Sequence, residues 1–273
     1  MKKLIDDITA QLSVCYPEDE ARSLAWWVIE ESTGLNRSQL LCGCKDTAFS
    51  PYMQEIVDRL LHFEPIQYIF GHTLWLDLDL KVTPATLIPR SETAELVERV
   101  ECEKWKVERL KVLDIGTGSG CIAIALKKLH PEWQITGVDI SAEAIEVAKE
   151  NAERNGVDVN FMQADVFADS FDSIGHFDIV VSNPPYVCES EKKSMRPNVL
   201  NFEPATALFV PDDDPLRFYH RIASLHKGDW LFFEINEAYA TEMEALMREQ
   251  GYEQIQITED IYGKPRVIAG RMA

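Results

Sequence analysis

The spacing of apolar positions changes near residue 74, and this change divides the chain. Before it, apolar residues recur with the period of a helix, as at Leu4, Ile8 and Leu12. After it, the stretch from Leu74 to Val82 alternates apolar with polar or acidic residues, which indicates a strand or a hairpin. The pattern predicts a small helical bundle over residues 1–73, a β-hairpin linker over residues 74–90 and a third domain over residues 91–273.

Local signals predict where individual helices begin and end. Breaks in the helical bundle are expected at Gly34 and around Asp46 to Pro51. Beyond the linker, Ser91 is the expected N-cap of a helix. Its apolar face is expected to consist of Leu96, Val97 and Val100.

From Leu110 onward, short apolar runs alternate with helical segments. This βαβ alternation predicts an α/β domain with a mostly parallel sheet that is covered by helices on both faces. Ligands of such sheets bind outside the carboxyl ends of the strands. The predicted strands are Val112–Ile115, Ile135–Val138, Val159–Met162, Phe177–Val181, Trp230–Ile235, Gln254–Ile257 and Arg266–Ala269.

A glycine-rich turn follows the first of these strands. It consists of Gly116, Thr117, Gly118, Ser119 and Gly120, and a helical run comes directly after it. Glycines let the backbone turn tightly and approach a ligand closely. A dinucleotide-binding fingerprint would need its third glycine at position 121, which disfavours a dehydrogenase. The spacing found here resembles the cofactor loop of S-adenosylmethionine-dependent methyltransferases.

Acidic residues follow the next two strands. Asp139 ends the second strand, where one carboxylate accepts hydrogen bonds from both hydroxyls of a ribose. Asp165 follows the third strand and is a candidate acceptor for an adenine amino group, with Val166 packed against the ring. The alternative for Asp165 is a solvated surface carboxylate.

The most specific motif lies at the end of the fourth strand, where Asn183, Pro184, Pro185 and Tyr186 follow one another. Proline has a restricted φ and lacks an N–H group, so two in succession make a stiff ledge with free carbonyl oxygens. The Asn183 side-chain oxygen and the Pro184 carbonyl could each accept one N–H of a planar NH₂ group. Tyr186 would supply an apolar wall.

Such a ledge suits methylation of a nitrogen whose lone pair is delocalised, because positioning and electrostatics then carry most of the catalysis. Asn183 and Pro184 are therefore the expected catalytic residues. No general base is assigned, because the methylated nitrogen is acidic enough to lose its proton to water.

Charge narrows the choice of partner. The chain of 273 residues holds 27 basic and 46 acidic residues, a formal net charge of −19. Nucleic acids bind chiefly through Lys and Arg, so we expect no DNA partner. No apolar run of about 18 residues occurs, so we expect no membrane association and a cytoplasmic protein.

Six cysteines and six histidines are scattered without metal-ligand spacing. Cys42 and Cys44 form the closest pair, and two ligands do not make a metal site. We expect reduced thiols, no metal ion and a monomeric protein.

Together these residues resemble the HemK-type glutamine methyltransferases that modify peptide chain release factors. The similarity extends over nearly the whole chain. The blocks that carry it are Pro65–Ile69 with Gly71, Leu87–Arg90 with Glu92 and Thr93, Val112–Leu126, Phe177–Tyr186, and Phe202–Pro204 with Ala207–Phe209.

The resemblance implies a class I S-adenosylmethionine-dependent methyltransferase domain, with a Rossmann-like and mostly parallel seven-stranded sheet. It also implies a preceding all-α domain that recognises the release factor. The methyl acceptor would be the side-chain amide nitrogen of the glutamine in a Gly-Gly-Gln motif. The resemblance places the cofactor on Gly116 to Gly120, Asp139, Val166 and Asn183, and the substrate glutamine on Asn183 to Tyr186.

The chain departs from the family pattern outside the glycine turn and the Asn-Pro-Pro-Tyr motif. Ser91 and Ala94 stand where the family usually has Pro and Glu. An acidic segment, Val210 to Pro215, replaces an expected glycine-rich one, and Asn236 and Pro265 stand where Gly and Asp are usual. The chemistry is therefore predicted more firmly than the protein substrate.

Three alternatives remain open at this point. A glutamine methyltransferase of a ribosomal protein would use the same chemistry. A methyltransferase of the adenine amino group in nucleic acid would use the same ledge, but would need a basic target-recognition segment. A non-catalytic adaptor would have lost the cofactor loop or the ledge, and both are intact.

Overall fold

The computed structural model describes residues 1–43 and 48–273. These residues form two compact units. One contains Met1–Gly71 together with Arg196–Phe202, and the other contains His72–Met195 together with Glu203–Ala273. The second unit thus starts with the hairpin, two residues before the predicted linker.

The first unit is helical, as its periodicity predicts. Leu4, Ile8 and Leu12 are buried in one apolar core with described residues of four further helices. The predicted break at Gly34 is confirmed, because this residue ends a helix with a φ of 66°. Of the predicted break from Asp46 to Pro51, residues 48–50 lie outside any helix and the next helix begins at Pro51, whereas Asp46 and the residue Cys44 lie outside the described residues. The helices are α1 (Lys2–Leu12), α2 (Glu18–Thr33), α3 (Arg37–Leu41), α4 (Pro51–Leu61), α5 (Ile66–Phe70) and α9 (Pro197–Phe202).

The second unit is built on a seven-stranded sheet, which confirms the predicted fold class. All seven predicted apolar runs are strands of this sheet. Its order is β10-β11-β9-β6-β3-β4-β5, and every neighbouring pair from β9 to β5 is parallel. β11 is antiparallel to both of its neighbours. The strands are β3 (Lys111–Ile115), β4 (Gln134–Asp139), β5 (Asn160–Gln163), β6 (Phe177–Ser182), β9 (Gly228–Glu234), β10 (Tyr252–Glu259) and β11 (Pro265–Met272).

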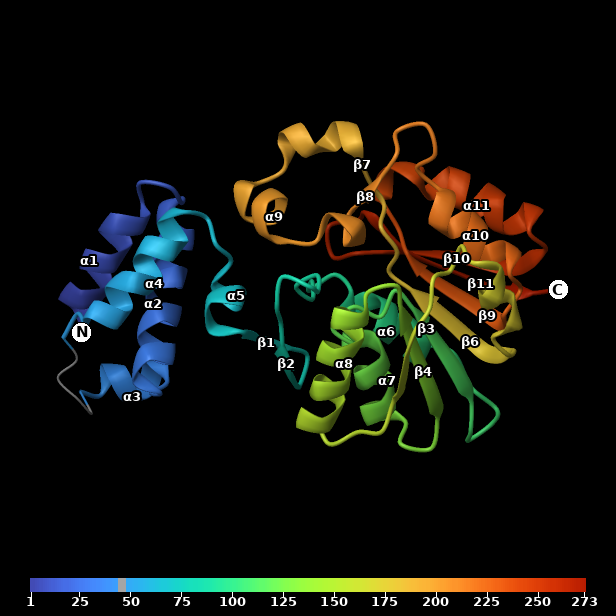
Figure 1. The fold of residues 1–273 in the computed structure, drawn as a ribbon, viewed down its shortest axis with the longest axis horizontal. Helices are drawn as coiled ribbons and strands as arrows, with labels where there is room; N and C mark the ends of the chain where they lie inside the picture. Colours follow the sequence, from blue (N-terminus) through green and yellow to red (C-terminus); the bar gives the residue numbers. More distant parts are fainter. Residues whose placement is uncertain (44–47) are drawn as a thin grey trace. The chain divides into compact units, whose positions relative to one another are not determined.

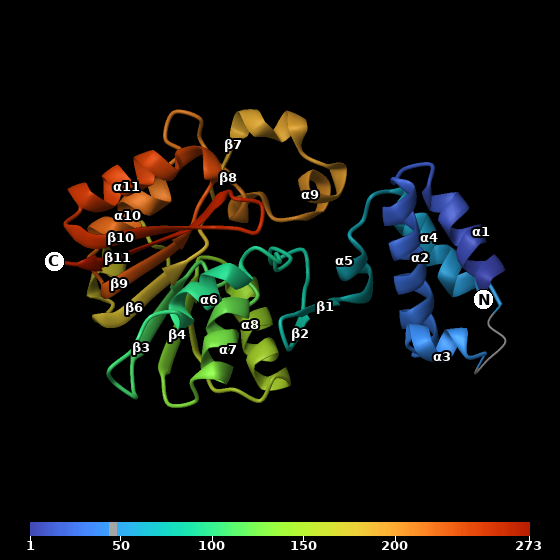
Figure 2. The same ribbon diagram turned by 180° about the vertical axis from the view of Figure 1, so that it is seen from behind.

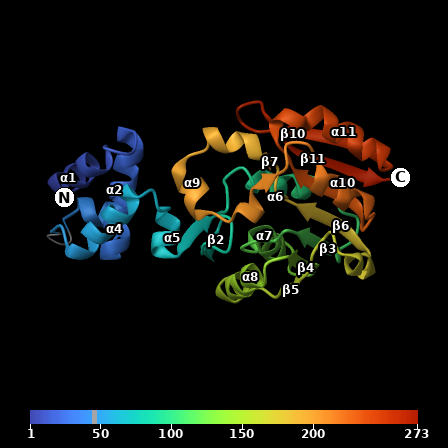
Figure 3. The ribbon, with the colours of Figure 1, turned by 45° about the horizontal axis from the view of Figure 1, so that its top comes forward.

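Helices cover both faces of this sheet (Figure 1, Figure 2). Alternate residues of each strand enter different cores, so that Val112 packs on one face and Leu113 on the other. The first face carries α6 (Ala94–Glu101), α7 (Cys121–Leu129) and α8 (Ala142–Arg154). The second carries α10 (Arg217–Ser224) and α11 (Ala240–Glu249), which Figure 3 shows across the sheet from α7 and α8.

One local expectation needs correction. Ser91 is not an N-cap, because α6 begins at Ala94 and has no side-chain cap; the Ser91 hydroxyl donates to Glu92 instead. The hairpin expected in the stretch from Leu74 to Val82 is confirmed, and its apolar residues do not share one face. A turn after β1 (His72–Trp75) reverses the chain into β2 (Leu78–Lys81). Leu74 is therefore 76% exposed while Leu80 is fully buried.

The segment after Tyr186 contains structure that the sequence analysis did not predict. β7 (Val187–Cys188) pairs in parallel with β8 (Phe209–Val210), far along the chain. Short 3-10 helices cover Asp169–Ser173, Glu189–Ser194, Ala205–Ala207 and Glu237–Tyr239. The β7–β8 pair brings the residues around Phe209 next to the end of the Asn-Pro-Pro-Tyr motif.

Candidate active site

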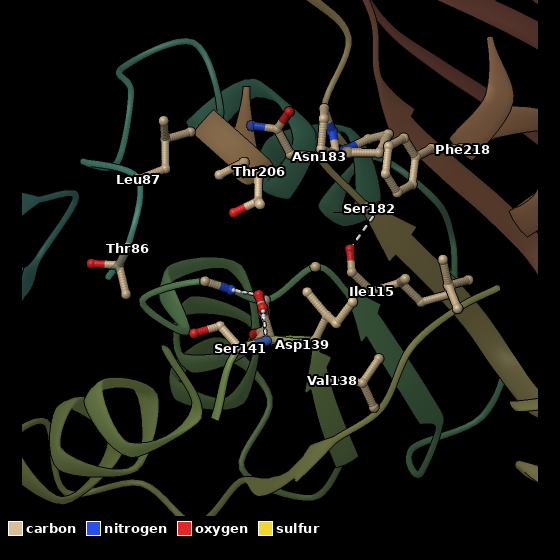
Figure 4. A pocket seen from close by; sticks show the side chains of 18 of the residues that line it. Thr86, Leu87, Ile115, Val138, Asp139, Ser141, Ser182, Asn183, Thr206 and Phe218 are labelled. Carbon is tan, nitrogen blue, oxygen red and sulfur yellow. Dashed lines mark hydrogen bonds between the residues drawn. The ribbon is translucent and has the colours of Figure 1, made fainter. Parts of the chain in front are cut away.

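A cavity of about 500 Å³ lies at the point where the strand order reverses, between β3 and β6. Ile115 and Ser182 are register partners at the carboxyl ends of these strands, and the Ser182 hydroxyl donates to the Ile115 carbonyl at 2.7 Å. Both residues line the cavity, and Figure 4 shows them between Asn183 and Asp139 in that view. Parallel sheets bind ligands at such a switch point.

The glycine turn forms one wall of the cavity. Gly116, Gly118 and Gly120 all have positive φ values, of 75°, 55° and 82°, which favour glycine. The N–H groups of Gly116 and Thr117 both donate to the Val138 carbonyl at 2.9 Å. This pair of hydrogen bonds ties the turn to the neighbouring strand.

The five residues of the turn do not all face the cavity. Gly116 to Ser119 line it, and Gly120 does not. A Cβ at Gly120 would lie 3.0 Å from the Ile124 side chain and 3.1 Å from those of Ala148 and Phe161. Gly120 therefore allows α7 to pack closely against α8 and β5.

Asp139 lies at the end of β4 and lines the cavity. Its Oδ2 accepts the Gly118 N–H at 2.9 Å, and its Oδ1 accepts the Ser141 N–H at 2.9 Å (Figure 4). Burial raises the pKa of Asp139, and the backbone hydrogen bonds act in the opposite direction. Each carboxylate oxygen has a second lone pair, so both remain able to accept ligand hydroxyls.

Asp165 and Val166 both line the cavity, beside β5. The Asp165 side chain is exposed at the surface, and its Oδ1 accepts the Phe167 N–H at 2.9 Å. Val166 is buried, and its carbonyl accepts the Arg221 Nε–H at 2.7 Å. Phe167 packs edge-on against Phe218 with 5.1 Å between ring centroids, and both rings line the cavity.

The Asn-Pro-Pro-Tyr motif forms the wall beside the glycine turn. Asn183, Pro184 and Pro185 line the cavity, and the Asn183 Nδ2 donates to the Thr93 hydroxyl at 3.1 Å. Tyr186 is not among the lining residues, and its hydroxyl donates to Glu234 at 2.9 Å. Burial is the main reason why the pKa of Tyr186 is raised, and the negative charge of Glu234 raises it further.

Other lining residues were not singled out as site residues from the sequence. Arg90 lines the cavity, and its guanidinium donates to Glu203 at 2.6 Å. The Ile88 N–H donates to the other oxygen of the same carboxylate, whose side chain is 1% exposed. Arg90 and Glu203 both belong to sequence blocks that carry the family resemblance. The acidic residue directly before Pro204 was therefore the signal in the sequence that could have pointed to this contact. The cavity wall around Arg90 also contains Leu87, Pro89, Pro204, Thr206, Ala207 and Phe209.

Within residues 1–43 and 48–273, no group of His, Cys, Asp or Glu side chains could hold a metal ion. Across the same ranges, no helix has the length and apolar character that crossing a membrane requires. The described cysteines are free thiols, and burial raises the pKa of Cys121, which lines the cavity, to about 12.

Comparison with known proteins connects this geometry to a family. The "PrmC N-terminal domain" family matches residues 3–71, and the "Methyltransferase small domain" family matches residues 92–201. A release factor glutamine methyltransferase of Bacteroides thetaiotaomicron is 42% identical, over 98% of this chain and 99% of its own. Its namesake in Flavobacterium psychrophilum is 38% identical, over 94% of each chain.

Solved structures show the same fold at low sequence identity. The catalytic domain of hMettl16, in complex with a 3′UTR hairpin, has a TM-score of 0.55 at 19% identity, over 72% of this chain and 76% of its own. A methyltransferase from Pyrococcus furiosus has a TM-score of 0.53 at 16% identity, over 78% and 96% of the two chains. The full-length similarity to curated relatives is much greater, and the chain belongs to the family of release factor glutamine methyltransferases.

Proposed function

We propose that this protein transfers a methyl group from S-adenosylmethionine to the side-chain amide nitrogen of the glutamine in the Gly-Gly-Gln motif of peptide chain release factors. The observation that carries the proposal is the position of Asn183 and Pro184. They follow Ser182, whose register partner Ile115 leads directly into the glycine turn, and both line the same cavity. The methyl donor and a planar NH₂ group would therefore meet there.

The cavity lining fits this cofactor. Asp139 offers spare lone pairs for ribose hydroxyls, and Val166, with the ring of Phe167 nearby, offers an apolar surface for adenine. The positive φ values of the glycine turn let its backbone come close to the cofactor. We assign the cofactor to Gly116, Thr117, Gly118, Ser119, Asp139, Asp165, Val166 and Asn183, and give Gly120 a packing role.

When bound, S-adenosylmethionine supplies a sulfonium methyl group whose C–S bond breaks as the new C–N bond forms, leaving S-adenosylhomocysteine. The Asn183 Oδ1 and the Pro184 carbonyl accept the two N–H groups of the glutamine amide. They thereby hold its nitrogen in line with the methyl group, and their dipoles favour the positive charge that develops on it.

The excess proton leaves to water. Asp139 and Asp165 are the acidic residues among those that line the cavity, and both belong to the cofactor end. This supports a mechanism without a general base. Pro185 lines the acceptor side, and Tyr186 supports it from behind.

Release factors are the proposed protein partners, and residues 1–73 their recognition domain. The full-length relatives and the family match to residues 3–71 support both assignments. We propose that the protein acts as a monomer, in the cytoplasm, where release factors act on ribosomes.

The test incubates the purified protein and radiolabelled S-adenosylmethionine with the release factors of the same organism, with ribosomal proteins and with duplex DNA. Mass spectrometry then locates the label. We expect it on the Gly-Gly-Gln glutamine. Label on another protein's glutamine or on adenine would overturn the substrate assignment, and cofactor binding without transfer would overturn the activity.

A further inference from the structure

We propose that Glu234 and Thr93 are positioning residues that orient the Asn183 side chain for catalysis. The inference rests on the proposed function, because it explains how the assigned methyl-acceptor contact is held. The structure shows a continuous hydrogen-bond chain from Glu234 through Thr93 to Asn183. Glu234 does not line the cavity, so it acts through Thr93.

Glu234 is the last residue of β9, the strand next to β6, and it is 1% exposed. Its Oε2 accepts the Thr93 hydroxyl at 2.7 Å, and its Oε1 accepts the Tyr186 hydroxyl at 2.9 Å. One carboxylate therefore holds both ends of the Asn-Pro-Pro-Tyr motif, directly at Tyr186 and through Thr93 at Asn183.

The direction of these hydrogen bonds determines which side of the Asn183 amide, NH₂ or oxygen, points toward Thr93. A hydroxyl has one hydrogen, and that of Thr93 points to Glu234, so Thr93 Oγ1 is left only as an acceptor. It therefore binds the NH₂ side of Asn183, at 3.1 Å. The amide is planar, so its Oδ1 faces away from Thr93, and no described residue donates to it. This leaves the oxygen free to accept a substrate N–H.

Two hydroxyl donors and one nearby positive charge partly offset the burial of the Glu234 carboxylate. Burial raises its pKa, whereas the hydroxyl donors of Thr93 and Tyr186 and the charge of Arg266 act in the opposite direction. Glu92 is the neighbouring negative charge, and Tyr219 donates its hydroxyl to the backbone carbonyl of Glu234 at 2.9 Å.

The experiment compares Thr93→Val, Thr93→Ser and Glu234→Gln with the wild-type protein. Valine has the shape of threonine without the hydroxyl, so we expect kcat for release factor methylation to fall about 10- to 100-fold, because misplaced groups cost rates of this order. The two hydroxyls bind different oxygens of Glu234, and glutamine replaces one of these oxygens with an NH₂ donor, so one contact is lost and kcat should also fall. Serine keeps the hydroxyl and should restore most of the turnover. In all three variants the Kd for S-adenosylmethionine should stay within about threefold of the wild-type value.

Thr73→Val is the matched control, because Thr73 is a buried threonine of the β1–β2 hairpin that does not line the cavity. Equal kcat values for Thr93→Val and wild type would overturn the proposal. The proposal would also be overturned if the loss of kcat in Thr93→Val were matched by losses of melting temperature and cofactor affinity. A failure of Thr93→Ser to restore turnover would overturn it as well.

A second measurement does not depend on activity. In ¹⁵N-labelled protein, the side-chain amide resonance of Asn183, identified by its loss in Asn183→Ala, should move in Thr93→Val and Glu234→Gln but stay in Thr93→Ser. If wild type methylates no release factor while these shifts occur, the proposed function fails and the hydrogen-bond chain stands. An unmoved resonance in Thr93→Val would overturn the positioning role.

Discussion

At the residue scale, the cavity separates the groups that we propose bind the cofactor from those that we propose bind the methyl acceptor. Asp139 receives two backbone N–H groups and belongs to the β4 side, whereas Asn183 follows β6. Their side chains come from different strands, so changes to them should have separable effects. Sequence reasoning placed both residues at the carboxyl ends of predicted strands, because Asp139 directly follows Ile135–Val138 and Asn183 comes two positions after Phe177–Val181.

Asn183→Ala should lower kcat about 10²- to 10³-fold, the usual cost of removing a group that stabilises developing charge. The Kd for S-adenosylmethionine should change little, because most of the proposed cofactor contacts lie elsewhere. Calorimetry and steady-state kinetics measure the two effects. Asn160→Ala, at an exposed position of β5, is the control. A loss of cofactor affinity as large as the loss of turnover would contradict this division of roles.

Asp139→Ala should have the opposite effect. Losing a charged acceptor for ribose hydroxyls should weaken S-adenosylmethionine binding about 10- to 100-fold, since such hydrogen bonds contribute about 1.5–3 kcal/mol. With saturating cofactor, kcat should remain within a few-fold of wild type. Asp158→Ala, at an exposed position in the connection between α8 and β5, is the control. Unchanged affinity in Asp139→Ala would rule out the ribose assignment.

Asp114 predicts a pH dependence of stability. It is fully buried, its Oδ1 has no hydrogen-bond partner, and burial raises its pKa to about 7. The folded protein therefore keeps a proton that the unfolded chain releases near pH 4, so the contribution of Asp114 to the free energy of unfolding falls as the pH rises to about 7. An asparagine side chain does not titrate, so the advantage of wild type over Asp114→Asn should shrink across this window in urea denaturation. Parallel curves would contradict the raised pKa.

At the element scale, the glycine turn between β3 and α7 allows α7 to pack closely against its neighbours. Three positive-φ glycines shape it, but only Gly120 would place a Cβ within 3.1 Å of three side chains. The other two meet open space or a single distant oxygen. At Gly116 and Gly118, glycine is therefore needed for the positive φ of the backbone. At Gly120 it is needed both for the positive φ and for the lack of space for a side chain.

Gly120→Ala should lower the free energy of unfolding by about 1–3 kcal/mol more than Gly156→Ala, because overpacking adds to the conformational cost. Gly156 has a φ of 68°, and no atom lies within 4 Å of the position that an alanine methyl group would take there, so it isolates the conformational part. Urea denaturation measures both. Equal losses would show that α7 shifts to accommodate the methyl group.

At the scale of the whole molecule, each unit has its own apolar core. Among the described residues, the core of the first unit draws on residues within 1–71, and the two cores of the second draw on residues from Trp75 onward. The cavity likewise is lined only by residues of the second unit. Cofactor binding and recognition of the protein partner should thus be separable.

A variant without residues 1–71 should bind S-adenosylmethionine with nearly the wild-type Kd. Its kcat/KM for an intact release factor should fall about tenfold or more, since contacts remote from the reacting atoms supply binding energy to the reaction. Methylation of a short Gly-Gly-Gln peptide should change much less. The ratio of the two kcat/KM values is the measurement, and an equal loss on both substrates would contradict a recognition role.

The amino-acid sequence by itself determined the strands of the main sheet and the motifs. Helical and strand periods, the glycine spacing and the Asn-Pro-Pro-Tyr motif are local patterns, so the seven strands and the residues that follow them could be predicted. The N-cap of α6 could not, because the Thr93 hydroxyl is bound by a residue 141 positions away.

Only the tertiary structure decided which polar side chains meet behind the motif. Glu234 lies within an apolar run and binds Thr93, and Glu203 binds Arg90 across 113 positions. Tyr186, expected as a wall of the cavity, turns its hydroxyl to Glu234. These contacts depend on strand order and register, which bring β9 beside β6, and a periodic pattern carries no information about which distant residues become neighbours.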